Sequence, residues 1–185
     1  MSQGKTLKGF KSIFVAGLLA FNCGSRLEAS SLENVGHAFQ YILPAYAFGL
    51  TCLQKDYEGS KQFLYAFGSS QLTVHALKLT TREKRPNYSE GDKKNSFPSG
   101  DSSSSFLGAA FIHRRYGFKQ AIIPYGFATL NAYSRVEAKK HYVHDVVAGA
   151  LISWAFVWLF VDPKSNIAVS SDEHMAAKVG YETAF

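Results

Sequence analysis

The chain has 185 residues, of which 46% are apolar, 15% aromatic and 18% charged. This length allows one domain with a substantial core and is short for two, and the composition excludes an intrinsically disordered chain. The net charge of +6 favours an anionic partner. No basic stripe with interleaved aromatic residues runs through the sequence, so nucleic acid is not the expected partner. The two cysteines are too few for a disulfide framework and have no partners at zinc-ligand spacing.

The first 29 residues have the order of an export signal. Lys5, Lys8 and Lys11 precede the apolar run 13–21, which small and polar residues follow. This order is typical of a secretory signal peptide. An N-terminal amphipathic helix that stays in the mature protein is the alternative for residues 1–29. We therefore expect an exported protein that is periplasmic or membrane-associated.

Apolar periodicity predicts helices through most of the remaining chain. The predicted helices cover residues 35–53, 61–80, 102–116, 120–133 and 141–161. Pro44 is expected to bend or interrupt the first of them, and Gly117 to separate the third from the fourth. The predicted fold class is all-α, a compact bundle of about five to six helices. The bundle forms a domain at residues 30–162, and a weakly patterned tail follows at 163–185.

Two further features bear on the arrangement of these helices. Residues 81–100 break the periodicity with charged, Pro and Gly residues, and a loop of about twenty residues inside a compact domain is usually functional. The longest uncharged apolar run, 146–161, would form a helix of roughly 24 Å, which is short of the ~20 residues usually needed to cross a bilayer. We therefore expect a soluble or peripherally attached bundle.

Two cations and a helix start point to an anion site around this loop. Lys78 lies at the end of the second predicted helix, and Arg85 follows after six intervening residues. A lysine point charge and a planar arginine fork hold phosphate in complementary ways. Ser99 and Gly100 directly precede a predicted helix, where free N–H groups and the helix dipole attract anions and glycine permits close approach. Taken singly, a solvated helix end and a simple turn are the alternatives.

The stretch 134–145 contains the residues of an activated histidine. If the segment from His141 onward is helical, His141 and Asp145 lie one turn apart on one face, so the carboxylate can orient the imidazole. Arg135 supplies a fixed planar cation that suits phosphate-like oxygens. A surface His–Asp pair is the alternative.

The order and spacing of these groups resemble those of the type 2 phosphatidic acid phosphatase superfamily, which also includes bacterial class A acid phosphatases and vanadium-dependent haloperoxidases. The resemblance covers roughly residues 35–160. The matching pattern is Lys78, six residues, Arg85-Pro86, then Pro98-Ser99-Gly100, then Ser134-Arg135, five residues, His141, three residues, Asp145.

This resemblance implies a helical bundle and a reaction without a metal ion or other cofactor. It implies that His141 is the nucleophile, with Asp145 as its partner, and that a phosphohistidine forms which water then hydrolyses. The implied substrate-binding residues are Lys78, Arg85, Ser99, Gly100 and Arg135. Such a set is suited to phosphoryl transfer, because cations and a helix start stabilise charge on the phosphoryl oxygens.

Asp101 is where the chain departs from the family pattern, which has a histidine after Pro-Ser-Gly. The family histidine resembles a general acid that protonates the leaving oxygen, so Asp101 occupies a catalytic position with a different side chain. A carboxyl group beside three cations is expected to be ionised. It would then repel a substrate phosphate and compete for Arg85 or Arg135. A helix N-cap is the alternative role for Asp101.

Two histidines lie outside this pattern. His75 is expected to pack in the core rather than bind a ligand. His144, next to Asp145, is expected to face solvent or to pack rather than assist the reaction.

The sequence therefore favours an exported, metal-independent phosphatase for a phosphate monoester or diphosphate. Its expected partner is a phosphorylated lipid or a small phosphoester, with peripheral contact to a membrane. A catalytically weakened relative that binds phosphorylated ligands is the alternative that Asp101 raises. A vanadate-dependent oxidant enzyme is disfavoured, because such enzymes are generally larger.

Overall fold

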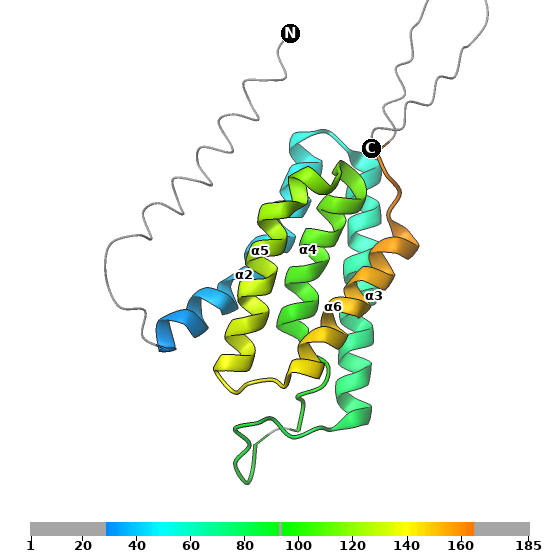
Figure 1. Cartoon of the computed structure of the whole chain (residues 1–185). Coiled ribbons are helices and arrows are strands. Elements are labelled where there is room, and N and C mark those ends of the chain that lie inside the picture. The colour runs from blue at the N-terminus through cyan, green and yellow to red at the C-terminus, as the bar shows by residue number, and fades with distance from the viewer. Residues whose placement is uncertain (1–28, 93, 165–185) are drawn as a thin grey trace, which may run out of the picture.

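The structure is a computed structural model that describes residues 29–92 and 94–164. These residues form five helices and no strand, which confirms the all-α bundle (Figure 1). The helices are α2 (Ala29–Leu53), α3 (Tyr57–Thr81), α4 (Gly100–Tyr116), α5 (Phe118–Glu137) and α6 (Val143–Phe160). The expected signal segment, apart from its last residue, and nearly all of the expected tail lie outside the described residues. The domain limits therefore stay predictions.

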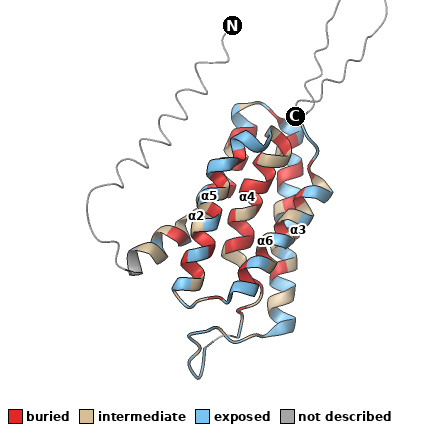
Figure 2. Cartoon of the chain, viewed as in Figure 1, coloured by how far each residue is buried: buried red, intermediate tan, exposed pale blue. Residues whose placement is uncertain are grey.

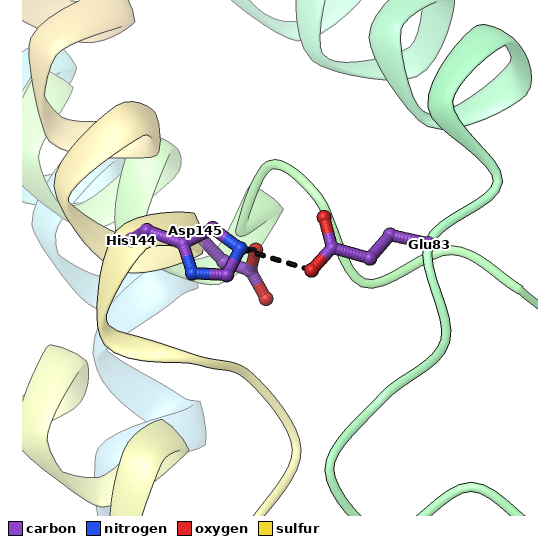
Figure 3. A group of neighbouring side chains, drawn as sticks. All are labelled: Glu83, His144 and Asp145. Atoms are coloured by element: carbon purple, nitrogen blue, oxygen red, sulfur yellow. Dashed lines mark hydrogen bonds and ion pairs between the residues drawn. The ribbon is translucent and has the colours of Figure 1, made fainter.

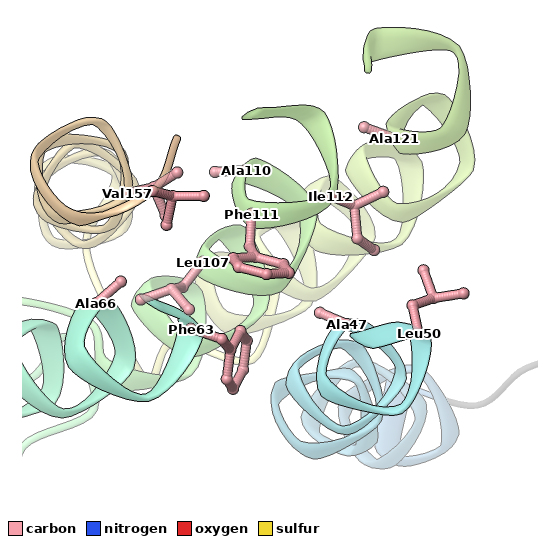
Figure 4. Packing of buried hydrophobic residues seen from close by; sticks show 11 residues of the cluster. Ala47, Leu50, Phe63, Ala66, Leu107, Ala110, Phe111, Ile112, Ala121 and Val157 are labelled. Atoms are coloured by element: carbon pink, nitrogen blue, oxygen red, sulfur yellow. The ribbon is translucent and has the colours of Figure 1, made fainter. Parts of the chain in front are cut away.

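Helix α4 is the central element of the bundle and contacts each of the other four helices (Figure 1). Most of its residues are buried, as the red ribbon in Figure 2 shows. The C-terminal half of α4 carries the large side chains Leu107, Phe111 and Ile112, all fully buried. Phe111 meets Phe63 of α3 edge-on, with 5.1 Å between ring centroids. Figure 4 shows side chains of α2, α3, α5 and α6 around this group.

The N-terminal half of α4 is packed through small hydroxyl side chains instead. Ser103 Oγ lies 3.0 Å from Ser70 Oγ of α3 and 2.9 Å from Ser153 Oγ of α6. A Cβ on Gly149 of α6 would lie 2.4 Å from the carbonyl oxygen of Ser99, so only glycine fits there. Because small residues let the helices approach closely and the buried hydroxyls find partners, the start of α4 is held close to the start of α6.

Pro44 does not interrupt α2, which runs unbroken from Ala29 to Leu53. A proline has no N–H for the carbonyl four residues earlier, which here is that of Gln40. Ser104 Oγ of α4 donates to this carbonyl at 2.6 Å and so replaces the missing helical bond. Gly108 permits the close approach, since a Cβ there would lie 2.7 Å from the backbone of Leu43. The expected interruption is thus wrong because a tertiary contact satisfies the freed carbonyl, whereas the alternative, a bend at Pro44, stays a prediction.

Capping residues set helix ends that differ from the predicted ones. α3 begins at Tyr57, since Asp56 Oδ1 accepts the N–H of Gly59 at 2.9 Å. α4 begins at Gly100 with Ser99 as its N-cap, so Asp101 lies in the first turn and the N-cap role expected as its alternative is wrong. α5 extends over both predicted ends, and α6 begins later than predicted, at Val143.

The end of the bundle at the α2–α3 link and the α4–α5 corner is closed by an ion pair. Arg115 Nη2 and Nε donate to the Asp56 carboxylate at 2.6 and 2.8 Å, and the Tyr116 hydroxyl donates to it at 3.0 Å. Less than a tenth of either charged side chain is exposed. Burial alone would raise the pKa of Asp56, but these bonds and the Gly59 amide lower it to about 2.

Among the described helices, α6 alone is long and apolar enough to cross a membrane, judged by length and composition. Only 28% of its 18 residues are buried. Large apolar side chains on its outer side, such as Val147, Leu151 and Trp158, are at least half exposed. An apolar helix with such an outer face is suited to contact with a lipid phase.

Candidate active site

A cavity of about 1210 Å³ opens at the end of the bundle where α3 and α5 finish and α4 and α6 begin. In Figure 1 this is the end at which the loop 82–99 extends from the bundle. Six of the eight predicted site residues line the cavity: Lys78, Arg85, Gly100, Asp101, Arg135 and His141. Ser99 and Asp145 do not line it; both are fully buried beside it.

His141 reaches Asp145 by a different route from the predicted helical turn. His141 precedes α6, and Tyr142 is the N-cap of that helix. The backbone N–H of His141 donates to the carbonyl of Arg135 at 3.3 Å, and this bond turns the link after α5 back toward the cavity. His141 Nδ1 then lies 3.4 Å from Asp145 Oδ2, and the side chain is 4% exposed. With Nδ1 on the side of the carboxylate, Nε2 is the nitrogen available to the cavity.

Asp145 is held as a carboxylate by its surroundings. Its Oδ2 accepts the Ser96 hydroxyl at 2.5 Å and the Tyr142 backbone N–H at 2.9 Å. Burial alone would raise the pKa of Asp145, but His141, Ser96 and the Tyr142 amide outweigh burial and lower it. The Asp145 carbonyl also accepts the N–H of Ser99 at 2.9 Å, so this residue joins the starts of α6 and α4.

Arg135 is buried in the wall of the cavity, with 3% of its side chain exposed. Its Nε donates to Ser134 Oγ at 3.2 Å, and its Nη2 donates to the carbonyl of Glu33 on α2. Its Nη1 lies 3.5 Å from Asp101 Oδ2. These contacts fix the guanidinium plane, as an oriented anion clamp requires.

Lys78 and Arg85 are brought together by one loop residue. Lys78 Nζ donates to the Asn95 carbonyl at 2.7 Å, and Arg85 Nε donates to Asn95 Oδ1 at 3.2 Å. Burial, and after it repulsion from Arg85, lower the pKa of Lys78 to about 8, against the opposing attraction of Asp101 and Asp145. Lys78 is therefore charged at neutral pH and loses its charge in mildly alkaline solution.

Ser99, a residue of the Pro-Ser-Gly motif, is also the N-cap of α4. Its Oγ accepts the N–H of Ser102 at 3.4 Å and lies 3.1 Å from Ser102 Oγ. The hydroxyl is thus used within the first turn of α4, whereas Gly100 forms part of the cavity wall. Of these two neighbouring residues, Gly100 therefore lines the cavity and Ser99 does not.

His144 is exposed, as predicted, but it also makes two close contacts (Figure 3). Its Nε2 lies 2.9 Å from Glu83 Oε1 and 3.0 Å from Asp145 Oδ1. Within the described residues, these three side chains are the one group of His, Cys, Asp and Glu whose ligand atoms lie close enough to hold a metal ion. The same geometry is that of a histidine that bridges two carboxylates, and it joins the loop to the start of α6.

The sequence motifs did not include several residues at the site. Arg82, Lys94 and Lys140 add positive charge to the cavity wall, and Ser96 supports Asp145 from behind it. The charged run 82–94 and the Lys139-Lys140 pair were the available signals for the cations, whereas no spacing marked Ser96. His75 was expected to pack in the core; it is exposed and lines the cavity, so that prediction is wrong.

Comparison with known proteins identifies the family of this helical bundle with its cationic cavity. The model of the PAP2 superfamily matches residues 60–165. The chain is 31% identical over 137 residues to the lipid A 4'-phosphatase of Helicobacter pylori, which covers 70% of this chain and 69% of that protein. This chain belongs to the PAP2 superfamily, and it is a phosphatase of that family, a phosphoric ester hydrolase.

Two further relatives are informative. The chain is 29% identical over 183 residues to the lipid A 1-phosphatase of Porphyromonas gingivalis, which covers 85% of this chain but 40% of that longer protein. The crystal structure of LpxE from Aquifex aeolicus superimposes with a TM-score of 0.59 at 25% identity, over 76% of this chain and 88% of that one. The resemblance found in the motifs is thus confirmed by similarity over most of the chain.

Proposed function

We propose that this protein hydrolyses a phosphate monoester of a phosphorylated membrane lipid of the lipid A type, with His141 as the nucleophile. The observation that carries the proposal is the position of His141. It lines a cavity that also presents Lys78, Arg85 and Arg135, and the buried Asp145 carboxylate stands 3.4 Å behind its Nδ1. The lipid class is supported by the relatives, which are lipid A phosphatases.

The proposed reaction has two displacements at phosphorus. First, His141 Nε2 attacks phosphorus, the bond to the leaving oxygen breaks, and a phosphohistidine forms. Then a water molecule attacks phosphorus, the P–N bond breaks, and phosphate leaves with His141 restored. Lys78, Arg85 and Arg135 stabilise the phosphoryl oxygens in both steps. The Asp145 carboxylate stabilises positive charge on the imidazole.

The leaving oxygen in the first step needs a proton, and Asp101 is poorly placed to supply it. Its carboxylate pairs with Arg135 at 3.5 Å and attracts the charge of Lys78. Because these contacts engage the carboxylate with cations, we infer that water in the open cavity takes this role. We infer that the first displacement is slow for substrates whose leaving group is a strong base.

A second candidate function follows from the ion pair between Asp101 and Arg135. With Asp101 bound to Arg135, the cavity holds an internal anion where a substrate phosphate would bind. In this alternative, the protein binds phosphorylated lipids and hydrolyses them very slowly. Turnover of a lipid phosphate at the rates of ordinary phosphatases would exclude it.

The test of the proposed function is phosphate release from a purified lipid A phosphate in detergent micelles with a metal chelator present. We expect release by the unmodified protein and none by His141→Ala. His113→Gln is the matched control, because His113 lies at the other end of α4, next to Tyr125. Brief reaction with ³²P-labelled substrate should label the protein in an acid-labile form. Labelling or release that persists in His141→Ala would exclude the phosphohistidine.

A further inference from the structure

The cavity continues from the phosphate end as a groove between α2 and α3. Its wall residues on each helix recur at intervals of three or four positions, so they share one helix face. In order from the charged end, they are Glu33, His37, Gln40, Tyr41 and Pro44 on α2, and Leu79, Lys78, His75, Gln71 and Phe67 on α3. Along its length the groove therefore presents charged side chains, then a histidine and an amide on each wall, and then the apolar side chains of Pro44 and Phe67.

The two glutamines carry hydrogen-bond donors without partners. Nε2 of Gln40 and Nε2 of Gln71 are both buried and make no hydrogen bond to any part of the chain that the structure describes. A buried donor left unpaired costs roughly 1–3 kcal/mol. Gln40 and Gln71 both line the cavity, so an acceptor group of a ligand bound there would satisfy the two donors when the terminal amides turn toward it.

The two amides lie at the same level of the groove and on fixed backbone. Gln40 lies thirteen residues before the end of α2, and Gln71 fourteen residues after the start of α3. Ser104 Oγ holds the Gln40 carbonyl at 2.6 Å, and Ser70, next to Gln71, pairs with Ser103 of α4 at 3.0 Å. Each amide is seven residues from the charged wall residue of its helix, Glu33 or Lys78, or roughly 10 Å at a rise of ~1.5 Å per residue.

We propose that Gln40 and Gln71 form a subsite that binds the acyl carbonyl oxygens of the substrate, and so selects ester- or amide-linked acyl lipids. The proposal rests on the proposed function and specifies the part of the lipid that the protein recognises. In an acylated, phosphorylated headgroup, the carbonyls lie between the phosphate and the hydrocarbon chains. This is the order of charged, amide and apolar surface along the groove.

The test compares two phosphorylated lipids that differ only in linkage, one ester-linked and one ether-linked, in the same detergent micelles. The ether lipid lacks the carbonyl acceptors. The readout is the ratio of their dissociation constants, which requires no turnover. We expect the unmodified protein to bind the ester lipid about tenfold more tightly, the scale of one or two neutral hydrogen bonds. In Gln40→Leu and Gln71→Leu this preference should shrink toward one.

The variants should fold, because neither amide nitrogen donates a hydrogen bond to any described residue that leucine would remove. Gln120→Leu is the matched control; this exposed α5 residue donates to the carbonyl of Tyr116 at the α4–α5 corner, does not line the cavity, and should keep the full preference. Equal affinity for the two lipids in the unmodified protein would overturn the subsite, and so would an undiminished preference in both variants. If neither lipid binds, the subsite and the lipid substrate both fail. Hydrolysis of p-nitrophenyl phosphate by the unmodified protein would then show whether a soluble-ester phosphatase remains.

Discussion

Asp101 is the residue that departs most from the family pattern, and we expect its effect on hydrolysis to depend on the leaving group. Asp101→His should supply a transferable proton and free Arg135 from its ion pair at 3.5 Å. We expect hydrolysis of an alkyl phosphate to rise by about 10²-fold, the usual scale of general acid catalysis. p-Nitrophenyl phosphate, whose leaving group is a weak base, should gain much less.

Asp101→Asn separates the two effects of this change. It removes the negative charge without adding a transferable proton, so binding of inorganic phosphate should tighten while turnover of the alkyl ester stays low. The measurements are initial rates on both esters and the phosphate dissociation constant. If Asp101→His slows the alkyl ester, Asp101 is itself a working acid and the assignment made here is wrong.

Lys78 predicts a pH dependence of anion binding. Its pKa, lowered to about 8 by burial and then by Arg85, means that it carries its charge below about pH 8 and loses it above. Affinity for inorganic phosphate should therefore fall by about tenfold or more from pH 7 to pH 9, since a hydrogen bond from a charged donor is lost. Lys78→Arg keeps its charge throughout and should remove this step. Titration calorimetry at each pH measures the dissociation constant of phosphate. An equal loss of affinity in Lys78→Arg would mean that another group causes the pH dependence.

At the scale of elements, the loop 82–99 contacts the start of α6 at two points. Ser96 bonds Asp145 at 2.5 Å, and Glu83 reaches His144 at 2.9 Å. The Ser96 N–H donates to the Glu83 carbonyl at 3.0 Å, so the two contacts are coupled. The loop is thus positioned to orient Asp145, and through it His141.

Ser96→Ala should therefore lower kcat more than it changes KM. The lost hydrogen bond to a carboxylate is worth about 1.5–3 kcal/mol, or roughly 10- to 100-fold. Because Ser96 favours the ionised form of Asp145, its removal should raise the pKa of Asp145 and move the acid limb of the pH–rate profile to higher pH. Ser89→Ala, an exposed position of the same loop, is the control. If the acid limb of the pH–rate profile does not move in Ser96→Ala, Ser96 has only a structural role.

At the scale of the whole molecule, the Asp56–Arg115 pair joins the α2–α3 link to the α4–α5 corner. The pKa of Asp56 in the folded protein is about 2, below its ordinary value of 3.8. A lowered carboxyl pKa contributes stability that is present above about pH 4 and is lost as the pH falls toward 2. The difference of about two units corresponds to roughly 2 kcal/mol.

Urea unfolding from pH 7 to pH 2 measures this contribution. Asp56→Asn should be less stable at pH 7 and should lose less stability on acidification than the unmodified protein. Arg115→Met should cost more, about 3–5 kcal/mol, because it leaves a buried carboxylate unpaired. The double variant should recover part of that loss. Parallel acid profiles for the unmodified protein and Asp56→Asn would show that other carboxylates govern acid stability.

The sequence by itself identified the family and the class of fold. The motif spacing identified six residues that line the cavity, because a catalytic set constrains residue types at fixed intervals whatever lies between them. The 3.6-residue periodicity identified the helices, since it reflects burial of one face along a continuous segment. The place of Asp101 in the set was equally visible, because it occupies one position of a spaced motif.

Only the tertiary structure decided which groups from distant segments meet. Ser104 satisfies the carbonyl that Pro44 leaves free, so α2 is not interrupted at the proline, where the sequence predicted an interruption or a bend. His141 faces Asp145 across the start of α6 rather than along a helical turn, because caps and loop contacts set where that helix begins. The unpaired amides of Gln40 and Gln71 share a groove because α4 holds α2 and α3 in place around it. These contacts depend on close packing between helices, and local periodicity carries no record of such packing.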